Sequence, residues 1–297
     1  MKDLLRLGIC ILLPSSLLFY SCSSSKKSGV KSSIDEEKLE IIKKAIRPGE
    51  VELLVIEGVF PTGGILECQN RKIMYTVKEN KLKAFLSETY FSKKRPYKCT
   101  FTHKGIERVL AEIKVNDKSF PSERLKVDKK RVFLSKKNQK RAARERALRQ
   151  KAYSKSAKRP LFRDAFQLPI LSKVTSIYGS RRIFNQKKQT QHLGTDFRAK
   201  VGTPIKSSNR GIVVLSRNFF YSGNTVVIDH GLGVFTTYGH LSKRYVSEGE
   251  VINKKTVIGL AGATGRVTGP HLHWGVTVNN LAVEGESLIK ASQEFKY

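Results

Sequence analysis

From about residue 164 onward, the chain consists of short β-favouring runs separated by glycines. The runs are NRGIVVLS, NTVVIDHG, GVFTTYGH, VIGLAGATG and HLHWGVTV, and no long helical pattern interrupts them. Short runs of β-branched and aromatic residues bounded by glycine are typical of strands. Many such runs without intervening helices restrict this region to a mainly-β domain. We therefore predict that residues 164–297 form a mainly-β domain.

The last of these runs carries two histidines one residue apart, His271 and His273. Residues i and i+2 of a strand point to the same face, so both imidazoles lie on one side. Leu272 and Trp274 then occupy the other face. Two imidazoles on one face are suited to a shared metal ion, although a lone His-x-His also occurs in strands by chance.

Two further motifs contain metal-ligand residue types. HLGTD places His192 and Asp196 on either side of a glycine-containing turn, and YGHLS places His240 after a β run. Catalytic zinc takes three protein ligands and keeps a fourth position open. His192, Asp196 and one histidine of the His-x-His pair would supply such a set, so the three motifs together predict a metal site.

These residues resemble the lysostaphin/LytM-type zinc metallopeptidases, which are peptidoglycan endopeptidases. The motifs HLGTD, YGHLS and TGPHLH occur in the order found in that family. SIYGSRRIFN, GTPIKSSNRGIVV, VVIDHGLGVFTTYGHLS and GLAGATG extend the resemblance over residues 172–289. The resemblance implies an antiparallel β-sheet domain with an open groove.

The resemblance also implies the role of each site residue. His192, Asp196 and His273 are expected to bind one Zn²⁺, and His240 and His271 are expected to be the catalytic pair. The implied reaction is hydrolysis of peptide crosslinks of peptidoglycan by a zinc-activated water that the two histidines assist.

Two residues near the first motif are candidates for substrate binding. Asn185 matches a family asparagine, and Arg182 has the charge to meet a carboxylate of a peptide stem, unless it is simply solvated. His230 matches no ligand position and is interpreted as a turn or supporting histidine. The alternative function is a non-catalytic LytM-like wall-binding adaptor or amidase activator, but every motif position is filled here.

The N-terminus has the pattern of an exported bacterial lipoprotein. Lys2 and Arg6 precede an apolar run that is too short to span a bilayer stably, as in a signal peptide. Ser21-Cys22 resembles a lipoprotein processing site, which predicts a signal peptide over residues 1–21 and lipidation of Cys22. The alternative is secretion without lipid. We expect a cell-envelope protein facing the periplasm, without distinguishing the inner from the outer membrane.

The segments that follow predict a tether and a small domain. Residues 22–48 are expected to form a Ser/Lys-rich tether and then a short helix, because apolar residues near its end recur at helical spacing. Residues 49–126 alternate strand-like runs with turns, which predicts a small all-β domain. Cys68 and Cys99 lie in it and form either a disulfide, which export favours, or two buried free thiols.

Residues 127–163 are expected to form a basic helical linker. The stretch 124–163 has 17 Lys/Arg and 2 acids, a net charge of +15 out of +31 for the whole chain. Such a helix is either a solvated linker or an electrostatic contact to anionic lipid or polymer. Nucleic acid is not an expected partner, since the signal peptide predicts export and no recognition motif is present.

Overall fold

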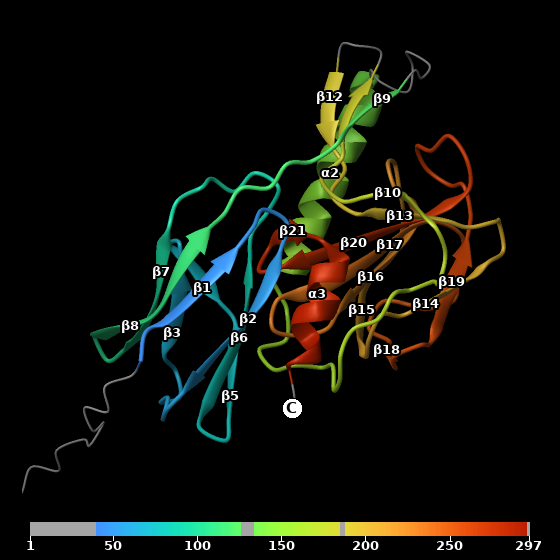
Figure 1. Ribbon diagram of the computed structural model, residues 1–297. Coiled ribbons are helices and arrows are strands. Elements are labelled where there is room, and N and C mark those ends of the chain that lie inside the picture. Colours follow the sequence, from blue (N-terminus) through green and yellow to red (C-terminus); the bar gives the residue numbers. More distant parts are fainter. Residues whose placement is uncertain (1–39, 126–133, 185–187, 296–297) are drawn as a thin grey trace, which may run out of the picture. The chain divides into compact units, whose positions relative to one another are not determined.

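The computed structural model describes residues 40–125, 134–184 and 188–295 (Figure 1). Contacts group Lys38–Tyr297 into one unit. The predicted signal peptide, the lipidation residue Cys22 and the rest of the predicted tether segment up to residue 39 lie outside the described residues.

The N-terminal part of the described chain contains two β-sheets. The first is five-stranded, in the order β1-β8-β7-β3-β4. Its strands are β1 (Ile42–Ile46), β8 (Ile106–Val115), β7 (Tyr97–His103), β3 (Ile65–Cys68) and β4 (Arg71–Ile73). The second sheet has the order β2-β6-β5, with strands β2 (Val51–Glu57), β6 (Lys81–Ser87) and β5 (Tyr75–Lys78). Residues 49–121 contain strands of these two sheets and no helix, so this part of the chain is all-β, and the predicted domain bounds of 49–126 stay a prediction.

The prediction of a helix before Pro48 is wrong, because these residues form strand β1. Ile42–Ile46 is a strand that pairs in parallel with β8, with Ile42 opposite Ala111 and Ile46 opposite Val115. Residues four apart share a face in a helix and also in a strand, since four is a multiple of two. The spacing of Ile42 and Ile46 therefore did not distinguish the two structures, and the free edge of β8 selects the strand.

A disulfide joins the two cysteines of this small domain. Cys68 and Cys99 lie directly opposite one another in the antiparallel pair β3–β7, and their sulfurs are bonded. Both side chains are buried in a core with Leu54, Leu82 and other apolar residues of both sheets. The bond therefore lies inside the domain core.

The C-terminal part is organised around a ten-stranded sheet. Its central path runs β10-β13-β20-β17-β16-β15-β18, and every pair in it is antiparallel. The strands on this path are β10 (Val174–Ser176), β13 (Thr195–Arg198), β20 (His271–Val278), β17 (Val234–Arg244), β16 (Gly223–Asp229), β15 (Gly211–Phe219) and β18 (Val251–Ile252). Three more strands join it at the side: β14 (Pro204–Lys206), β19 (Val257–Ala261) and β21 (Leu281–Val283). The predicted antiparallel β-sheet domain is confirmed.

One short helix in this domain was not predicted. Helix α3 (Gly285–Gln293) buries Leu288 and Ala291 and contacts both β2 and β20 (Figure 1). Phe85 of β6 stacks on Phe295 just beyond α3, with ring centroids 5.3 Å apart. Side chains of the small domain thus share one apolar core with the C-terminal sheet.

The basic linker contains a long helix, as predicted. Helix α2 (Lys136–Tyr153) begins at Ser135, whose hydroxyl accepts a hydrogen bond from the backbone N–H of Asn138. None of its residues is fully buried, but Leu148 and Tyr153 pack on an apolar cluster of β15, β16 and β17. The helix is therefore attached to the C-terminal sheet by a narrow stripe of apolar side chains.

A third small sheet joins the end of the N-terminal part to the C-terminal domain. It has the order β12-β11-β9, with strands β12 (Lys188–Gln191), β11 (Arg181–Phe184) and β9 (Ser122–Leu125). Strand β9, which follows the small domain, pairs in parallel with β11. Strand β11 therefore lies between β9 and β12.

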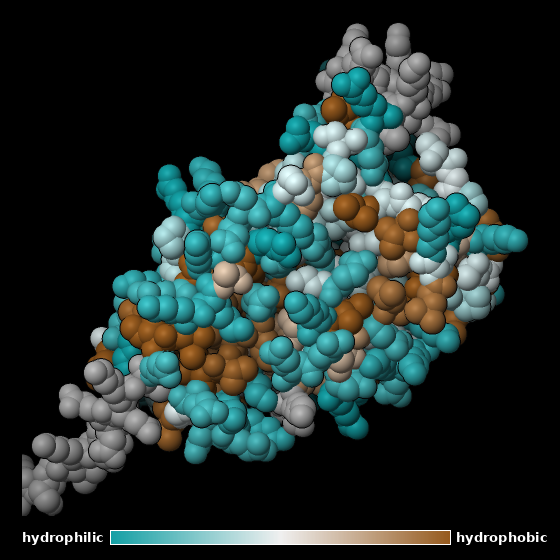
Figure 2. Space-filling model, in the orientation of Figure 1, coloured by the Kyte–Doolittle hydropathy of each residue, from teal (hydrophilic) through white to brown (hydrophobic). Residues whose placement is uncertain are grey.

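Hydrophilic residues cover most of the face seen in Figure 2, with apolar residues gathered over the five-stranded sheet. Within the described ranges, no helix has the length and apolar character that a membrane span requires.

Candidate metal centre

Strands β13 and β20 place two of the predicted ligands opposite one another. Asp196 and His273 are register partners in this antiparallel pair. Leu272 and Trp274 are buried on the other face of β20, as the alternation of the sequence predicts. A Cβ atom on Gly194 would lie 2.5 Å from the His273 imidazole, so this approach of the HLGTD turn requires glycine.

Three donor atoms converge on one point. Asp196 Oδ1 lies 3.0 Å from His192 Nε2 and 2.9 Å from His273 Nδ1, and the two nitrogens are 3.1 Å apart. A tetrahedral zinc ion with bonds of about 2.0–2.1 Å separates its donors by about 3.3 Å. Two imidazoles and one carboxylate at this spacing fit zinc after a small outward adjustment, and together they form a candidate metal site.

The hydrogen bonds of His192 direct its lone pair toward this point. Its Nδ1 lies 3.1 Å from the carbonyl oxygen of Ile177, which can only accept, so Nδ1 carries the proton. Nε2 is then unprotonated and faces Asp196 and His273. Burial, more than any other influence, lowers the pKa of His192 below its ordinary value. The ring is therefore neutral at pH 7, the form in which imidazole ligates metals.

Asp196 is ionised. Burial opposes ionisation, but the neighbouring imidazoles of His192 and His273 outweigh it and hold the pKa of this carboxyl well below its usual range. Its second oxygen, Oδ2, accepts a hydrogen bond from Arg182 Nη2 at 2.7 Å. One oxygen of the carboxylate thus faces the donor cluster and the other is held by a cation.

The two predicted catalytic histidines lie beside the donor cluster. The ring centroids of His240 and His271 are 4.7 Å apart, and His271 Nε2 lies 3.8 Å from Asp196 Oδ1. His240 Nδ1 donates to the carbonyl of Thr264 and His271 Nδ1 to that of Gly269, both at 2.9 Å. Each ring therefore presents an unprotonated Nε2 when neutral.

His240 has an unusual backbone and an unusual environment. Its φ of 62° is left-handed, a conformation that costs a β-branched or bulky residue free energy. Its backbone N–H donates to Ser222 at 2.7 Å, which helps to hold this turn of β17. Burial, followed by the neighbouring His273 and His271, lowers the pKa of His240 to about 3. This histidine is neutral at pH 7.

The two predicted substrate-binding residues have different outcomes. Arg182 lies with its guanidinium against Asp196 and Ser176, and only 23% of its side chain is exposed. Its contact with a substrate carboxylate stays a prediction. Asn185 lies outside the described residues. His230, interpreted as a supporting residue, is fully buried away from the donor cluster, with Nδ1 2.8 Å from the Arg210 carbonyl.

Two residues next to the ligands were not identified from the sequence. Ser176 Oγ lies 3.2 Å from His192 Nδ1, and Glu123 accepts a hydrogen bond from Ser176 at 3.0 Å. Glu123 is 69 residues before His192 in the chain and belongs to no family motif. Only the pairing of β9 with β11 brings it there, so no local pattern of the sequence identifies it.

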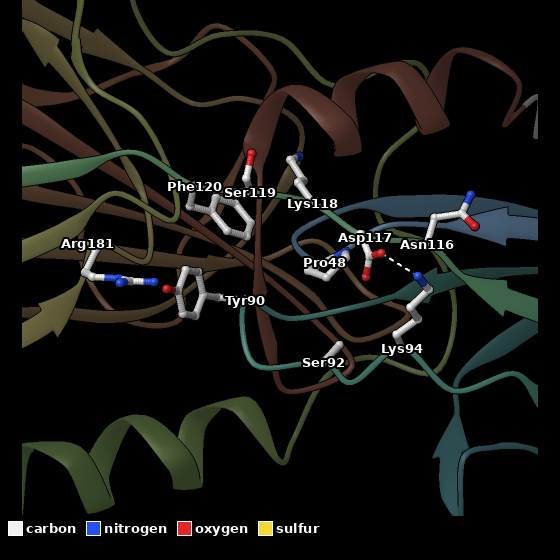
Figure 3. A pocket seen from close by; sticks show the side chains of 10 residues that line it. All are labelled: Pro48, Tyr90, Ser92, Lys94, Asn116, Asp117, Lys118, Ser119, Phe120 and Arg181. Carbon is white, nitrogen blue, oxygen red and sulfur yellow. Dashed lines mark hydrogen bonds and ion pairs between the residues drawn. The ribbon is translucent and has the colours of Figure 1, made fainter.

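A separate pocket lies beside this region. It has a volume of about 300 Å³ and contains none of the five predicted metal and catalytic residues. Figure 3 shows its lining residues, with an ion pair between Lys94 and Asp117. Arg181 lines it, next in sequence to Arg182, and Lys118 and Phe120 form another part of its wall.

Comparison with known proteins agrees with this geometry. Residues 190–284 match the model of Peptidase family M23. The chain carries a peptidase family M23 domain. A Pseudomonas aeruginosa protein assigned to peptidase M23 has a solved structure with a TM-score of 0.65 and 28% identity. That match covers 82% of this chain and 95% of the other, so the similarity extends beyond the M23 segment.

Curated relatives match the same region. The peptidoglycan DD-endopeptidase ShyA of Vibrio cholerae serotype O1 is 46% identical over 123 residues, which are 40% of this chain and 29% of ShyA. A DD-carboxypeptidase/endopeptidase Mpg of Neisseria meningitidis serogroup B is 35% identical over 125 residues, 42% of this chain and 29% of Mpg. The chain spans less than a third of the length of either relative.

Proposed function

We propose that this protein is an exported zinc-dependent endopeptidase that hydrolyses peptide crosslinks of bacterial peptidoglycan. One observation carries the proposal: three donor atoms of the types that zinc prefers lie 2.9–3.1 Å from one another, beside two further histidines. The names of the M23 relatives, which include peptidoglycan DD-endopeptidases, support the substrate class.

His192, Asp196 and His273 would hold the zinc ion. When bound, zinc supplies a Lewis acid that polarises the carbonyl of the scissile peptide bond. With Asp196 ionised and both imidazoles bound as neutral ligands, the site would carry a net charge of +1 with the dication bound. A positive site of this kind favours the negative charge that develops on the carbonyl oxygen during hydrolysis.

His240 and His271 would handle protons. His240 holds no proton on Nε2 at neutral pH, so that this atom can accept one from an attacking water. His271 is partly exposed, with 21% of its side chain accessible, and its Nε2 lies within 4 Å of Asp196. A protonated His271 would donate a hydrogen bond to the developing oxyanion or a proton to the leaving amine.

The test is digestion of purified sacculi and of a defined crosslinked muropeptide, followed by mass analysis of the products. The zinc-loaded protein is expected to release crosslink-cleaved products, and a chelator is expected to abolish them. His240→Ala serves as the matched variant that keeps all three ligands. Zinc-loaded protein that binds sacculi but releases no such products would instead indicate a wall-binding adaptor.

Export and membrane attachment form a second part of the proposal. They are supported by the signal-like residues 1–21 and the processing-site pattern at Cys22. Cys22→Ala is expected to move the protein from the membrane fraction to the soluble fraction after cell breakage. Equal membrane partitioning of the wild type and the variant would contradict lipidation.

Helix α2 offers a basic surface to an anionic partner near the membrane or in the cell wall. Its exposed side chains include six cations: Lys136, Lys137, Lys140, Arg144, Arg146 and Lys151. Its one acid, Glu145, is turned toward the sheet and accepts a hydrogen bond from the backbone of Phe220. Binding to vesicles of anionic phospholipid is expected to weaken steeply between 0.05 and about 0.5 M salt, where the screening length falls to roughly 4 Å.

A further inference from the structure

The segment that leaves the small β domain is docked on the M23 domain. We call residues 118–125 the docking segment. Lys118 forms an ion pair with Glu284 at 2.7 Å. Phe120 packs directly on Gly179, where an added Cβ atom would lie only 2.0 Å from the phenyl ring. Figure 3 shows Lys118 and Phe120 along one wall of the pocket.

Strand β9 completes this docking through backbone hydrogen bonds. The backbone N–H of Arg181 donates to the Pro121 carbonyl at 2.8 Å, and β9 then runs parallel to β11. In this register Glu123 lies opposite Arg182. A residue of the N-terminal part is thus fixed beside the group that holds Asp196.

Glu123 contacts two side chains that both touch metal ligands. Its Oε1 accepts a hydrogen bond from Ser176 Oγ at 3.0 Å, and its Oε2 lies 3.5 Å from Arg182 Nε. Arg182 Nη2 donates to Ser176 Oγ at 2.8 Å. The three side chains form a closed ring, in which Glu123 accepts a hydrogen bond from Ser176 and forms an ion pair with Arg182.

The ring adds a second acceptor, besides the Ile177 carbonyl, for the proton on His192 Nδ1. An ionised carboxylate only accepts hydrogen bonds, so Ser176 must donate its hydroxyl proton to Glu123. One lone pair of Ser176 Oγ accepts from Arg182, and the other can accept from His192 Nδ1–H, 3.2 Å away, which also faces the Ile177 carbonyl. This arrangement holds the proton on Nδ1 and leaves Nε2 for the metal. Outer-shell partners of this kind orient metal-bound histidines.

The ring also offsets charge near Asp196. Arg182 donates to Asp196 at 2.7 Å, so its positive charge competes with a metal cation for the same carboxylate. Glu123 places a negative charge on the other side of the guanidinium. Without Glu123, Arg182 would hold Asp196 more strongly. Its positive charge would also be less screened and would repel a bound dication more strongly.

We propose that Glu123 is a positioning residue of the metal centre, by which docking of β9 on β11 raises the affinity of His192, Asp196 and His273 for zinc. The inference rests on the proposed zinc site. It adds a residue of strand β9, which lies outside the matched segment 190–284, to the groups on which that site depends.

The experiment measures zinc affinity of the full chain by competition with a chromogenic chelator. Loss of an outer-shell partner typically weakens metal binding about 10–100-fold. Glu123→Ala is expected to raise the Kd for zinc within that range. Glu123→Gln keeps the size of the side chain and is expected to raise it less, because an amide can still accept from Ser176 but carries no charge.

Two further measurements separate positioning from general stability. Glu107→Gln, which changes an exposed acid of β8, is the matched control and is expected to leave the Kd for zinc unchanged. The visible absorption spectrum of the cobalt-saturated protein reports the geometry of the ligands and is expected to differ between wild type and Glu123→Gln. In a double-mutant cycle with Arg182→Gln, the effect of Glu123→Gln is expected to shrink, since the charge that it offsets is gone.

The outcomes distinguish this proposal from the proposed function. If the wild type binds zinc and Glu123→Gln binds it within twofold of the wild-type Kd with an unchanged cobalt spectrum, the role of Glu123 is refuted. The zinc site itself then stands. If the wild type binds no zinc, both proposals fail together.

Discussion

Burial of His230 is expected to make the stability of the protein depend on acid. The ring is 0% exposed, with Nδ1 against the Arg210 carbonyl and Nε2 2.7 Å from Thr236 Oγ1. Phe166 packs edge-on against it, with ring centroids 4.9 Å apart. Burial lowers the pKa of His230 from 6.5 to about 4. Folding must therefore keep this imidazole neutral where the unfolded chain would protonate it.

The sign and size follow from linkage. Between pH 6.5 and 4 the unfolded chain binds a proton at this position and the folded protein does not, so the free energy of unfolding falls as the pH is lowered. A pKa difference of about 2.5 corresponds to about 3 kcal/mol of lost stability near pH 4. Above pH 6.5 the imidazole is neutral in both the folded and the unfolded chain, so the full stability is present and none of this loss occurs.

The assay is denaturant unfolding of wild type and His230→Gln between pH 7.5 and 4, with a chelator present so that metal release does not contribute. The variant loses packing and is expected to be less stable at pH 7.5. Its deficit relative to the wild type is expected to shrink by about 3 kcal/mol toward pH 4. Unfolding free energies of the two proteins that stay parallel over this range would refute the reasoning.

Three more predictions concern the fold and the site. Reducing or replacing the Cys68–Cys99 disulfide, which joins residues 31 apart, is expected to lower stability by about 3–4 kcal/mol in denaturant unfolding; an unchanged midpoint with and without reductant would contradict this. Gly194→Ala is expected to displace the His273 ring and to raise the Kd for zinc at least tenfold, as measured by chelator competition. His240→Ala is expected to retain zinc and to lose about 10²–10⁴-fold in muropeptide turnover; loss of metal in this variant would overturn its separation from the ligands.

Much of the M23 domain could be predicted from the sequence, because its signals are local. The alternation in HLHWGVTV places Leu272 and Trp274 in the core and the two histidines on the other face, as found in β20. The glycine of the HLGTD motif is also visible in the sequence itself, and in the structure Gly194 leaves room for the His273 ring. The three motifs that meet at the donor cluster each carry their ligand residue types within five residues.

The rest depends on contacts between distant segments. The spacing of Ile42 and Ile46 fits both a helix and a strand, and only the edge of β8 decides between them. Helix α3 is nine residues long and is stabilised by packing on β2, which its own sequence does not reveal. Glu123 reaches Ser176 through the pairing of β9 with β11, more than fifty residues apart. These features required the three-dimensional structure.

The measurement that tests the central claim most directly is the zinc content and zinc affinity of the purified full chain, by elemental analysis and chelator competition. We expect one zinc per chain in the wild type. Asp196→Ala and His273→Ala are expected to lose it, since two remaining ligands hold zinc poorly. A wild-type protein without zinc after loading, or variants that keep the wild-type affinity, would contradict the account.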